Sequence, residues 1–332
     1  MKVRLQRNNE DEKEFRGEET LQKIQRIEEI IESEELSTSG YILSLIETDD
    51  KRFASGGDDG NISICSYDLN KRTWNRDIHK KKAHKNKVTS LCNLNGNRLA
   101  SGSWDNTIKI WAISERDLTL IKEIRKHTQI LRKVIPLSKG RFASCSDDRT
   151  VRIWDDNTYE CATILKYDDQ VISILQLKGK EVLVTASGYK SSTSISFWNL
   201  NDFTCQDTIK GYSVSWSTHM IELPDGNLAL SSNEEPYPIV IIDTSSYKIV
   251  NVIHLNERIF YYSSLCLFNK HSFIYACDGI FLQISNKDCS VLFKSTGGRF
   301  RGYWGGIIPL EGGKYFAIEN IKKINIVKTC YI

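Results

Sequence analysis

Short apolar runs separated by Gly, Asn, Asp and Ser dominate most of this 332-residue chain. One group reads V-T-S-L-C-N-L, R-L-A-S-G-S and I-K-I-W over residues 88–111, and a group of the same form follows over residues 131–154. Within a group, an apolar run, a small-residue run and a run of alternating apolar and polar positions are divided by turn-forming residues. This pattern predicts three short antiparallel strands joined by tight turns, with a fourth strand on the way to the next group.

The two groups are copies of one repeat. The frame of residues 84–111 returns 43 positions later, within residues 127–155. His84 and Asp105 have the same separation as His127 and Asp148, and a Trp follows each Asp at the same distance. A period of this length built from strands predicts four-stranded blades arranged radially.

These residues resemble the WD40 repeat family. In that family the His precedes the first strand of a blade, a Ser lies in the second, the Asp turns the second strand into the third, and the Trp closes the third. The resemblance implies a buried hydrogen-bonded chain in which the Asp accepts from the His ring, the ring meets the Ser hydroxyl, and the hydroxyl meets the indole N–H. The residues at these positions are His84, Ser101, Asp105, Trp111, His127, Ser144, Asp148 and Trp154.

The same His, Ser and Asp could instead form a hydrolase triad. However, the trio recurs in two consecutive repeats, and a network that stabilises each blade explains this repetition better than two active sites do. The chain also has no phosphate-binding Gly loop followed by Lys and Ser or Thr, no H-E-x-x-H and no G-x-S-x-G. We therefore expect a protein that is not an enzyme and that needs no cofactor or metal.

The other repeats are degenerate but keep the spacing of the closing position. The expected fold class is all-β: a seven-bladed WD40-type β-propeller over residues 37–332, with a short N-terminal helical extension. The third strands of the seven blades are expected to close at Cys65, Trp111, Trp154, Trp198, Ile242, Gln283 and Val327.

Residues 1–36 do not fit the repeat. Between residues 17 and 35, Leu21, Ile24, Ile27, Ile30 and Ile31 recur every three or four positions among charged residues, which favours an acidic amphipathic helix. Such a helix could bind a helical partner or self-associate through residues 17–35. Alternatively, the N-terminal segment supplies the strand that completes the last blade, over residues 27–33 or 2–6.

Charge, cysteine spacing and hydrophobicity indicate where the protein is located in the cell. The net charge is +3, with an acidic excess in residues 1–39 and a basic excess in the remainder. The nine cysteines include no C-x-x-C pair, which argues against a disulfide framework and a thiolate zinc site. No apolar run is long enough to span a membrane, and the N-terminus lacks a signal-peptide pattern. These features favour a cytoplasmic protein, with a nuclear location also open.

The resemblance implies that one face of the propeller binds a protein or peptide. Residues just before the first strand of each blade, and before the turn Asp, should lie on this face. Several of them are aromatic or basic, as in many protein interfaces. The sequence therefore favours a non-catalytic interaction scaffold or adaptor. The candidate partner-binding residues are Tyr41, Lys85, Lys87, Trp104, Trp216, Tyr261, Arg301 and Tyr303.

A second function remains open at this stage. The basic run from Lys80 to Lys87 could bind RNA or the phosphates of an acidic lipid. No aromatic residues are interleaved in this run, so nucleic acid is the weaker option.

Overall fold

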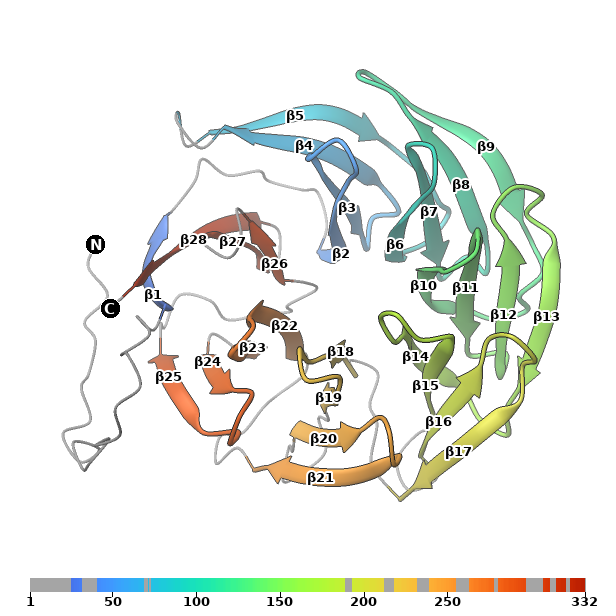
Figure 1. Cartoon of the computed structure of the whole chain (residues 1–332). Coiled ribbons are helices and arrows are strands. Elements are labelled where there is room, and N and C mark those ends of the chain that lie inside the picture. Colours follow the sequence, from blue (N-terminus) through green and yellow to red (C-terminus); the bar gives the residue numbers. More distant parts are fainter. Residues whose placement is uncertain are drawn as a thin grey trace, which may run out of the picture.

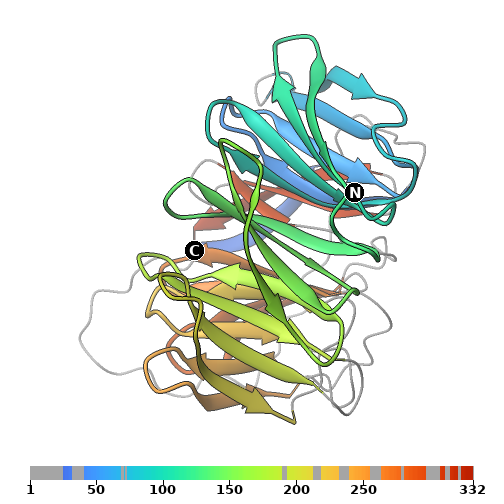
Figure 2. The same ribbon diagram turned by 90° about the vertical axis from the view of Figure 1, so that its right-hand side faces the viewer.

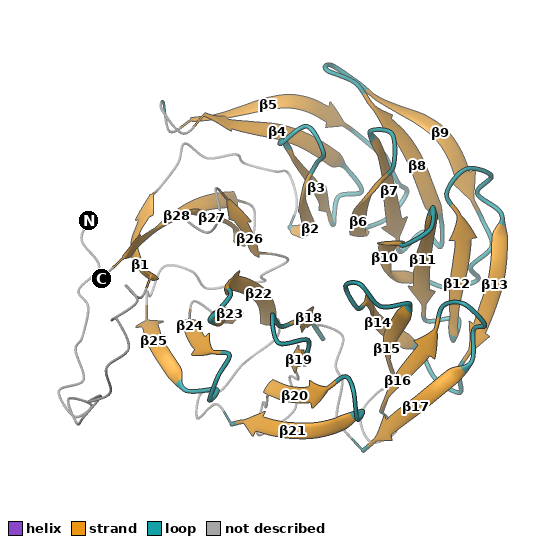
Figure 3. Ribbon diagram, in the orientation of Figure 1, coloured by secondary structure: helices purple, strands orange, loops and turns teal. Residues whose placement is uncertain are grey.

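The chain folds into a ring of small β-sheets (Figure 1). The computed structural model describes residues 25–31, 41–68, 71, 73–188, 193–211, 218–231, 239–254, 263–277, 280–296, 307–310, 315–320 and 323–331. These residues contain the strands β1 to β28, grouped into seven four-stranded sheets, and the part of the chain drawn in Figure 3 contains strands and loops but no helix.

Six of the sheets are formed by four consecutive strands each, which we call blades one to six. The bounds are β2 Ile42–Glu47, β3 Phe53–Gly57, β4 Ile62–Asp68 and β5 Thr73–Lys80 in blade one; β6 Val88–Leu94, β7 Arg98–Ser103, β8 Ile108–Ile113 and β9 Leu118–Ile124 in blade two; β10 Leu131–Leu137, β11 Arg141–Ser146, β12 Thr150–Asp155 and β13 Cys161–Lys166 in blade three; β14 Val171–Gln176, β15 Val182–Ser187, β16 Ser194–Asn199 and β17 Cys205–Lys210 in blade four; β18 Met220–Glu222, β19 Leu228–Ser231, β20 Ile239–Asp243 and β21 Lys248–Ile253 in blade five; β22 Ser263–Asn269, β23 Ser272–Cys277, β24 Ile280–Ser285 and β25 Val291–Thr296 in blade six.

The remaining sheet, blade seven, joins the two ends of the described chain. Its order is β26 Ile307–Leu310, β27 Tyr315–Asn320, β28 Lys323–Tyr331 and then β1 Gln25–Ile31, which pairs antiparallel with β28. The first strand of every blade lies innermost, and each contacts the first strand of the next blade, from β2 through β6, β10, β14, β18, β22 and β26 back to β2. Figure 2, turned by 90°, shows blades two to four from the outer side.

The hydrophobic core is divided into layers between neighbouring blades. Between blades two and three, Phe142 and Trp154 pack with apolar residues of β6, β7, β8 and β10. The second strands are buried along almost their whole length because they have a blade on either side, whereas outer strands such as β9 are exposed at their centre. Continuous apolar and small residues at β7 and β11 are what two-sided burial requires.

The predicted N-terminal helix is wrong where the structure describes it. Residues Gln25–Ile31 form strand β1, with a register shift between Ile27 and Glu29. A short isolated helix is marginal in water, whereas the outer position of blade seven offers this segment a full row of backbone partners on β28. The β-branched isoleucines also suit a strand. The alternative in which the N-terminal segment completes the last blade is the one that the structure shows. Residues 17–24 and 32–35 of the predicted helix lie outside the described residues.

The expected closing position of blade six is displaced by one residue. The first apolar residue of the second strand faces the closing residue of the third strand, as in Leu99 with Trp111 and Leu228 with Ile242. In blade six this partner of Phe273 is Ile284, and not Gln283. Gln283 is buried, and its side-chain amide donates to Ser272 Oγ at 3.0 Å.

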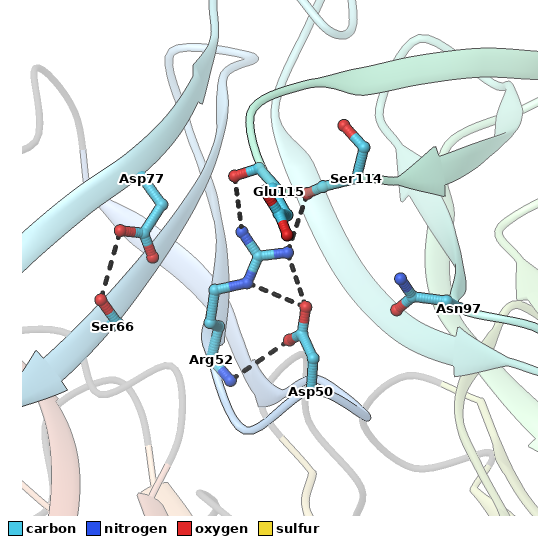
Figure 4. A pocket seen from close by; sticks show the side chains of 7 residues that line it. All are labelled: Asp50, Arg52, Ser66, Asp77, Asn97, Ser114 and Glu115. Atoms are coloured by element: carbon cyan, nitrogen blue, oxygen red, sulfur yellow. Dashed lines mark hydrogen bonds and ion pairs between the residues drawn. The ribbon is translucent and has the colours of Figure 1, made fainter.

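An arginine at the start of the second strand, or directly before it, links each of blades one to three to the next blade. Arg52 spans a cavity of about 540 Å³ between blades one and two, where its guanidinium is also paired with Asp50 (Figure 4). These arginines donate to backbone carbonyl oxygens beyond the third strand of the next blade: Arg52 to Ser114 and Glu115 at 2.9 and 3.3 Å, Arg98 to Asp156 at 2.6 Å, and Arg141 to Leu200 at 2.7 Å. The cavity is thus crossed by a bond that holds two blades together.

Candidate partner-binding face

Blades two and three each contain a buried chain of four polar side chains. In blade two, His84 Nδ1 lies 3.0 Å from Asp105 Oδ2 and His84 Nε2 lies 2.7 Å from Ser101 Oγ, while the Trp111 indole donates to the same Oγ at 2.8 Å. The tight turn at Asp105 and the loop before β6 bring these residues together, because Asp105 also accepts from Lys85 N at 2.9 Å.

Blade three repeats this geometry. His127 Nδ1 lies 2.7 Å from Asp148 Oδ2, His127 Nε2 lies 2.7 Å from Ser144 Oγ, and the Trp154 indole donates to that Oγ at 2.8 Å. The set is satisfied when each imidazole is neutral, donates from Nδ1 to the carboxylate and accepts the serine proton at Nε2. Every hydrogen-bonding group of these four side chains then has a partner. The network joins the loop before the blade to the turn between its second and third strands.

The hydroxyl groups in these networks are not placed for catalysis. Ser101 and Ser144 are completely buried. Each hydroxyl already meets an imidazole and an indole N–H. A nucleophile needs a substrate carbon within reach, and these oxygens face only protein, so the networks stabilise the blades.

A threonine two residues after the turn Asp completes each network and was missed in the sequence analysis. Thr107 donates to Asp105 Oδ1 and Thr150 donates to Asp148 Oδ1, both at 2.6 Å. The signal was present, since both repeats read D-x-T at this point. In blade four, Tyr167 stands in the His position and its hydroxyl donates to Thr185 Oγ1 at 2.9 Å.

Acid should destabilise the propeller in two stages. Burial lowers the pKa of His84 and His127. Burial alone raises the pKa of the two aspartates. Hydrogen bonds from His127 and Thr150 nevertheless lower the pKa of Asp148 to about 2. Hydrogen bonds from His84 and Thr107 likewise lower the pKa of Asp105. The unfolded chain therefore binds more protons than the folded chain as the pH falls, first through the ordinary histidine pKa and then through that of aspartate. We expect the free energy of unfolding in urea to fall below about pH 6.5 and more steeply below about pH 4. A value that is constant between pH 7 and 4 would contradict this assignment.

In blades one and two, the loops at one end of the strands hold three of the residues predicted for the partner-binding face: Tyr41, Lys87 and Trp104. In each of blades one to four, the residue before the first strand accepts a backbone hydrogen bond from the residue after the second strand. These bonds run from Asp58 to Tyr41 at 2.8 Å, Trp104 to Lys87 at 3.0 Å, Asp147 to Ile130 at 3.1 Å and Gly188 to Gln170 at 2.9 Å.

Trp104 is the centre of a small cluster on this face. Lys87 Nζ lies 4.8 Å from the centroid of the Trp104 ring, and the Arg132 guanidinium carbon lies 6.0 Å from it. Arg132 is itself held by Asp147 through bonds of 2.6 and 2.7 Å. The Trp104 indole nitrogen is buried and has no acceptor among the described residues. Two cations therefore lie over the ring, and its indole N–H has no acceptor among the described residues.

The surface around Trp104 is positively charged. Lys85 is exposed and Lys87 half-buried, and neither forms an ion pair within the described part of the chain. Nearby carboxylates are already engaged, because Asp58 accepts from Tyr41 N at 2.7 Å and Asp105 from His84. Tyr41, on the neighbouring blade, is 38% exposed. We call Tyr41, Lys85, Lys87 and Trp104 the basic aromatic face.

Half of the predicted partner-binding residues lie outside the described residues, and they stay predictions: Trp216, Tyr261, Arg301 and Tyr303. Arg132, which supports Trp104, was not among the predicted residues. In the described ranges, no group of His, Cys, Asp and Glu is arranged to hold a metal ion. Nor does that part of the chain contain a helix long and apolar enough to cross a membrane.

The comparisons with known proteins agree with this geometry. The family model "WD domain, G-beta repeat" matches residues 75–112 and 118–155, which contain the strands of blade two except for residue 113, and the first three strands of blade three. These stretches are WD40 repeats. The described sheets extend the four-stranded pattern of the WD40 repeats beyond the matched residues.

Several curated relatives align with the chain. It is 32% identical over 153 residues to nuclear distribution protein PAC1 of Arthroderma otae, covering 41% of this chain and 31% of that protein. It is 29% identical over 206 residues to anaphase-promoting complex subunit cdc20 of Dictyostelium discoideum, covering 60% and 38% of the two chains. It is 34% identical over 96 residues to THO complex subunit 3 of Arabidopsis thaliana, covering 27% and 30%. The aligned part thus spans about a third of the length of these relatives.

Proposed function

We propose that this WD40 propeller is a protein-interaction scaffold that recognises an acidic peptide segment on the basic aromatic face. The observation that supports this function best is Trp104, a half-buried tryptophan with the cations of Lys87 and Arg132 over its ring and an indole N–H without an acceptor among the described residues. Tryptophan, tyrosine and arginine are the residues that contribute most to binding energy at interfaces. The named relatives that belong to multi-subunit assemblies are compatible with such a role.

The chemistry of the face selects the partner. Lys85 and Lys87 have no internal counter-charge among the described residues, so an acidic side chain of a partner would gain an ion pair without breaking an existing one. The Trp104 N–H can donate to a partner carbonyl or carboxylate if the ring tilts on binding. The Arg132 guanidinium lies over the Trp104 ring and is itself paired with Asp147. Because these side chains are already ordered without a partner, binding loses less conformational entropy.

A capture experiment with matched variants tests this function. Tagged wild-type protein and the variant Lys85→Ala/Lys87→Ala/Trp104→Ala should be incubated with source lysate and the retained proteins quantified. The variant should lose at least about tenfold of a specific partner, because hot-spot tryptophans typically contribute about 2 kcal/mol or more. The control is Lys51→Ala/Lys178→Ala, which removes the same charge from the turns at the opposite end of the strands and should retain the partner.

Peptide binding then distinguishes the scaffold from a polyanion-binding protein. An acidic segment of the captured partner should bind wild type and lose most of its affinity with Trp104→Ala alone, at any salt concentration. If RNA or acidic vesicles bind instead, with an affinity that falls steeply with salt and is insensitive to Trp104→Ala, the scaffold assignment is wrong. Equal retention of all proteins by wild type and the triple variant would also refute it.

A further inference from the structure

One position of the innermost strands carries basic side chains in two blades and serine in four others. Register identifies the equivalent residues, since Ser44 pairs with Gly56, Ser90 with Gly102 and Ser173 with Ala186 on the second strand of their blades. Lys133 pairs in the same way with Cys145, and His219 accepts a backbone bond from Ser231 at 3.0 Å. The position thus reads Ser44, Ser90, Lys133, Ser173, His219 and Ser264 around blades one to six.

The first two serines link neighbouring blades. Ser44 Oγ accepts from Leu91 N at 3.0 Å, and Ser90 Oγ accepts from Val134 N at 3.0 Å. These hydroxyls use their bonding capacity on the next blade around the ring. Lys133 replaces a small hydroxyl with a long cation at this place, so its function is not the one the serines serve.

The side chain of Lys133 extends toward the innermost strand of the next blade. Lys133 Nζ lies 3.4 Å from Ser173 Oγ, the equivalent residue of the next blade. Beyond Ser173, the next equivalent residue is His219, whose pKa is lowered to about 3 by burial and by the positive charge of Lys133. Burial also lowers the pKa of Lys133. Lys133 and His219 thus occupy equivalent positions on the innermost strands of blades three and five, on either side of Ser173 in blade four.

Neither basic group has a counter-charge in the part of the chain that the structure describes. The ion pairs there involve other lysines, arginines and histidines, and no carboxylate lies within 4.0 Å of Lys133 Nζ. An uncompensated cation surrounded by protein is costly. Both residues nevertheless keep some solvent exposure, as a binding site requires.

We propose that Lys133, Ser173 and His219 form a binding site for a small oxyanion at the inner wall of the ring. Lys133 provides the charge and Ser173 a hydroxyl donor. The imidazole of His219 adds a ring N–H donor, and a bound negative charge favours its protonated form. Three donors on successive blades suit a group such as phosphate, because its several oxygens point in different directions.

Thermal unfolding in the presence of inorganic phosphate tests the site. At constant ionic strength, with chloride as the replaced salt, phosphate should raise the melting temperature of the wild type in a saturable manner, since it binds the folded state. Lys133→Met should abolish the saturable shift or weaken the apparent affinity at least tenfold. The matched control is Lys122→Met, at an exposed position on β9, which should respond like the wild type.

Two further measurements keep the outcome decisive. Lys133→Arg keeps the charge and should keep the phosphate response, so it serves if Lys133→Met folds poorly. The ring proton signals of His219, followed by NMR against pH, should show a higher pKa with phosphate than with chloride. The site is refuted if Lys133→Met responds to phosphate like the wild type, if Lys133→Arg folds but no longer responds, or if phosphate leaves the His219 titration unchanged.

Discussion

Replacing Trp154 with alanine should lower the free energy of unfolding by about 3–5 kcal/mol, the range for deleting a buried tryptophan. Trp154 is 1% exposed and stacks on Phe142, with ring centroids 6.0 Å apart, in the layer between blades two and three. The variant would leave a cavity that two blades share. It would also leave Ser144 Oγ without its indole donor, while His127 still depends on that oxygen.

Urea unfolding of Trp154→Ala and Trp154→Phe separates packing from hydrogen bonding. Phenylalanine keeps an aromatic ring in the layer but lacks the N–H, so this variant should lose only about 1–3 kcal/mol. The histidine should then show a changed titration, because the serine is free to turn. If both variants lose less than about 1 kcal/mol, Trp154 does not hold these blades together.

The two complete repeats could be predicted in detail because every residue of the network is required by another. A buried Asp needs the imidazole, the imidazole needs the hydroxyl, and the hydroxyl accepts the indole, so His84 and Trp111 occur as a set with fixed spacing. In the degenerate blades this mutual requirement is absent. Only apolar alternation remains there, and alternation does not distinguish Gln283 from Ile284, since strand register shifts by single residues at bulges.

Candidate binding residues could be predicted from the sequence only where their position within a single repeat determines their place in the structure. Trp104 and Lys87 follow from their places beside the turn and the first strand, which the structure joins by a backbone bond. Arg132 was missed because its contact with Trp104 comes from the neighbouring blade. Lys133 and His219 were missed for the same reason, since their equivalent positions follow from the register of three successive blades.

The N-terminal segment shows how a tertiary demand overrides local pattern. Ile27, Ile30 and Ile31 have helical spacing, yet Gln25–Ile31 pairs with β28. The periodicity indicates only that one face of the segment is apolar. It carries no information about the three C-terminal strands with which the segment pairs. The choice between helix and strand was therefore decided by backbone partners far away in the sequence.

Single proline substitutions in β1 should give an alternating result. Strand β1 lies at the edge of its sheet, so successive N–H groups point alternately toward β28 and away from it. Glu29, Ile30 and Ile31 pair in unbroken register with Lys328, Val327 and Ile326. We expect proline to cost about 1–3 kcal/mol where the N–H bonds to β28, by leaving a carbonyl unpaired, and clearly less at the neighbouring position.

Chemical unfolding of the three single variants reads this alternation directly. Ile30→Pro should differ from both Glu29→Pro and Ile31→Pro, and these two should resemble each other. Alanine at each site is the matched control, because it removes the side chain but keeps the N–H. A helix would lose about 3 kcal/mol at every interior position, so three equally damaging prolines would favour the helix over the strand. Three harmless prolines would mean that this segment does not complete blade seven, and the ring would then have to be closed by β26, β27 and β28 alone.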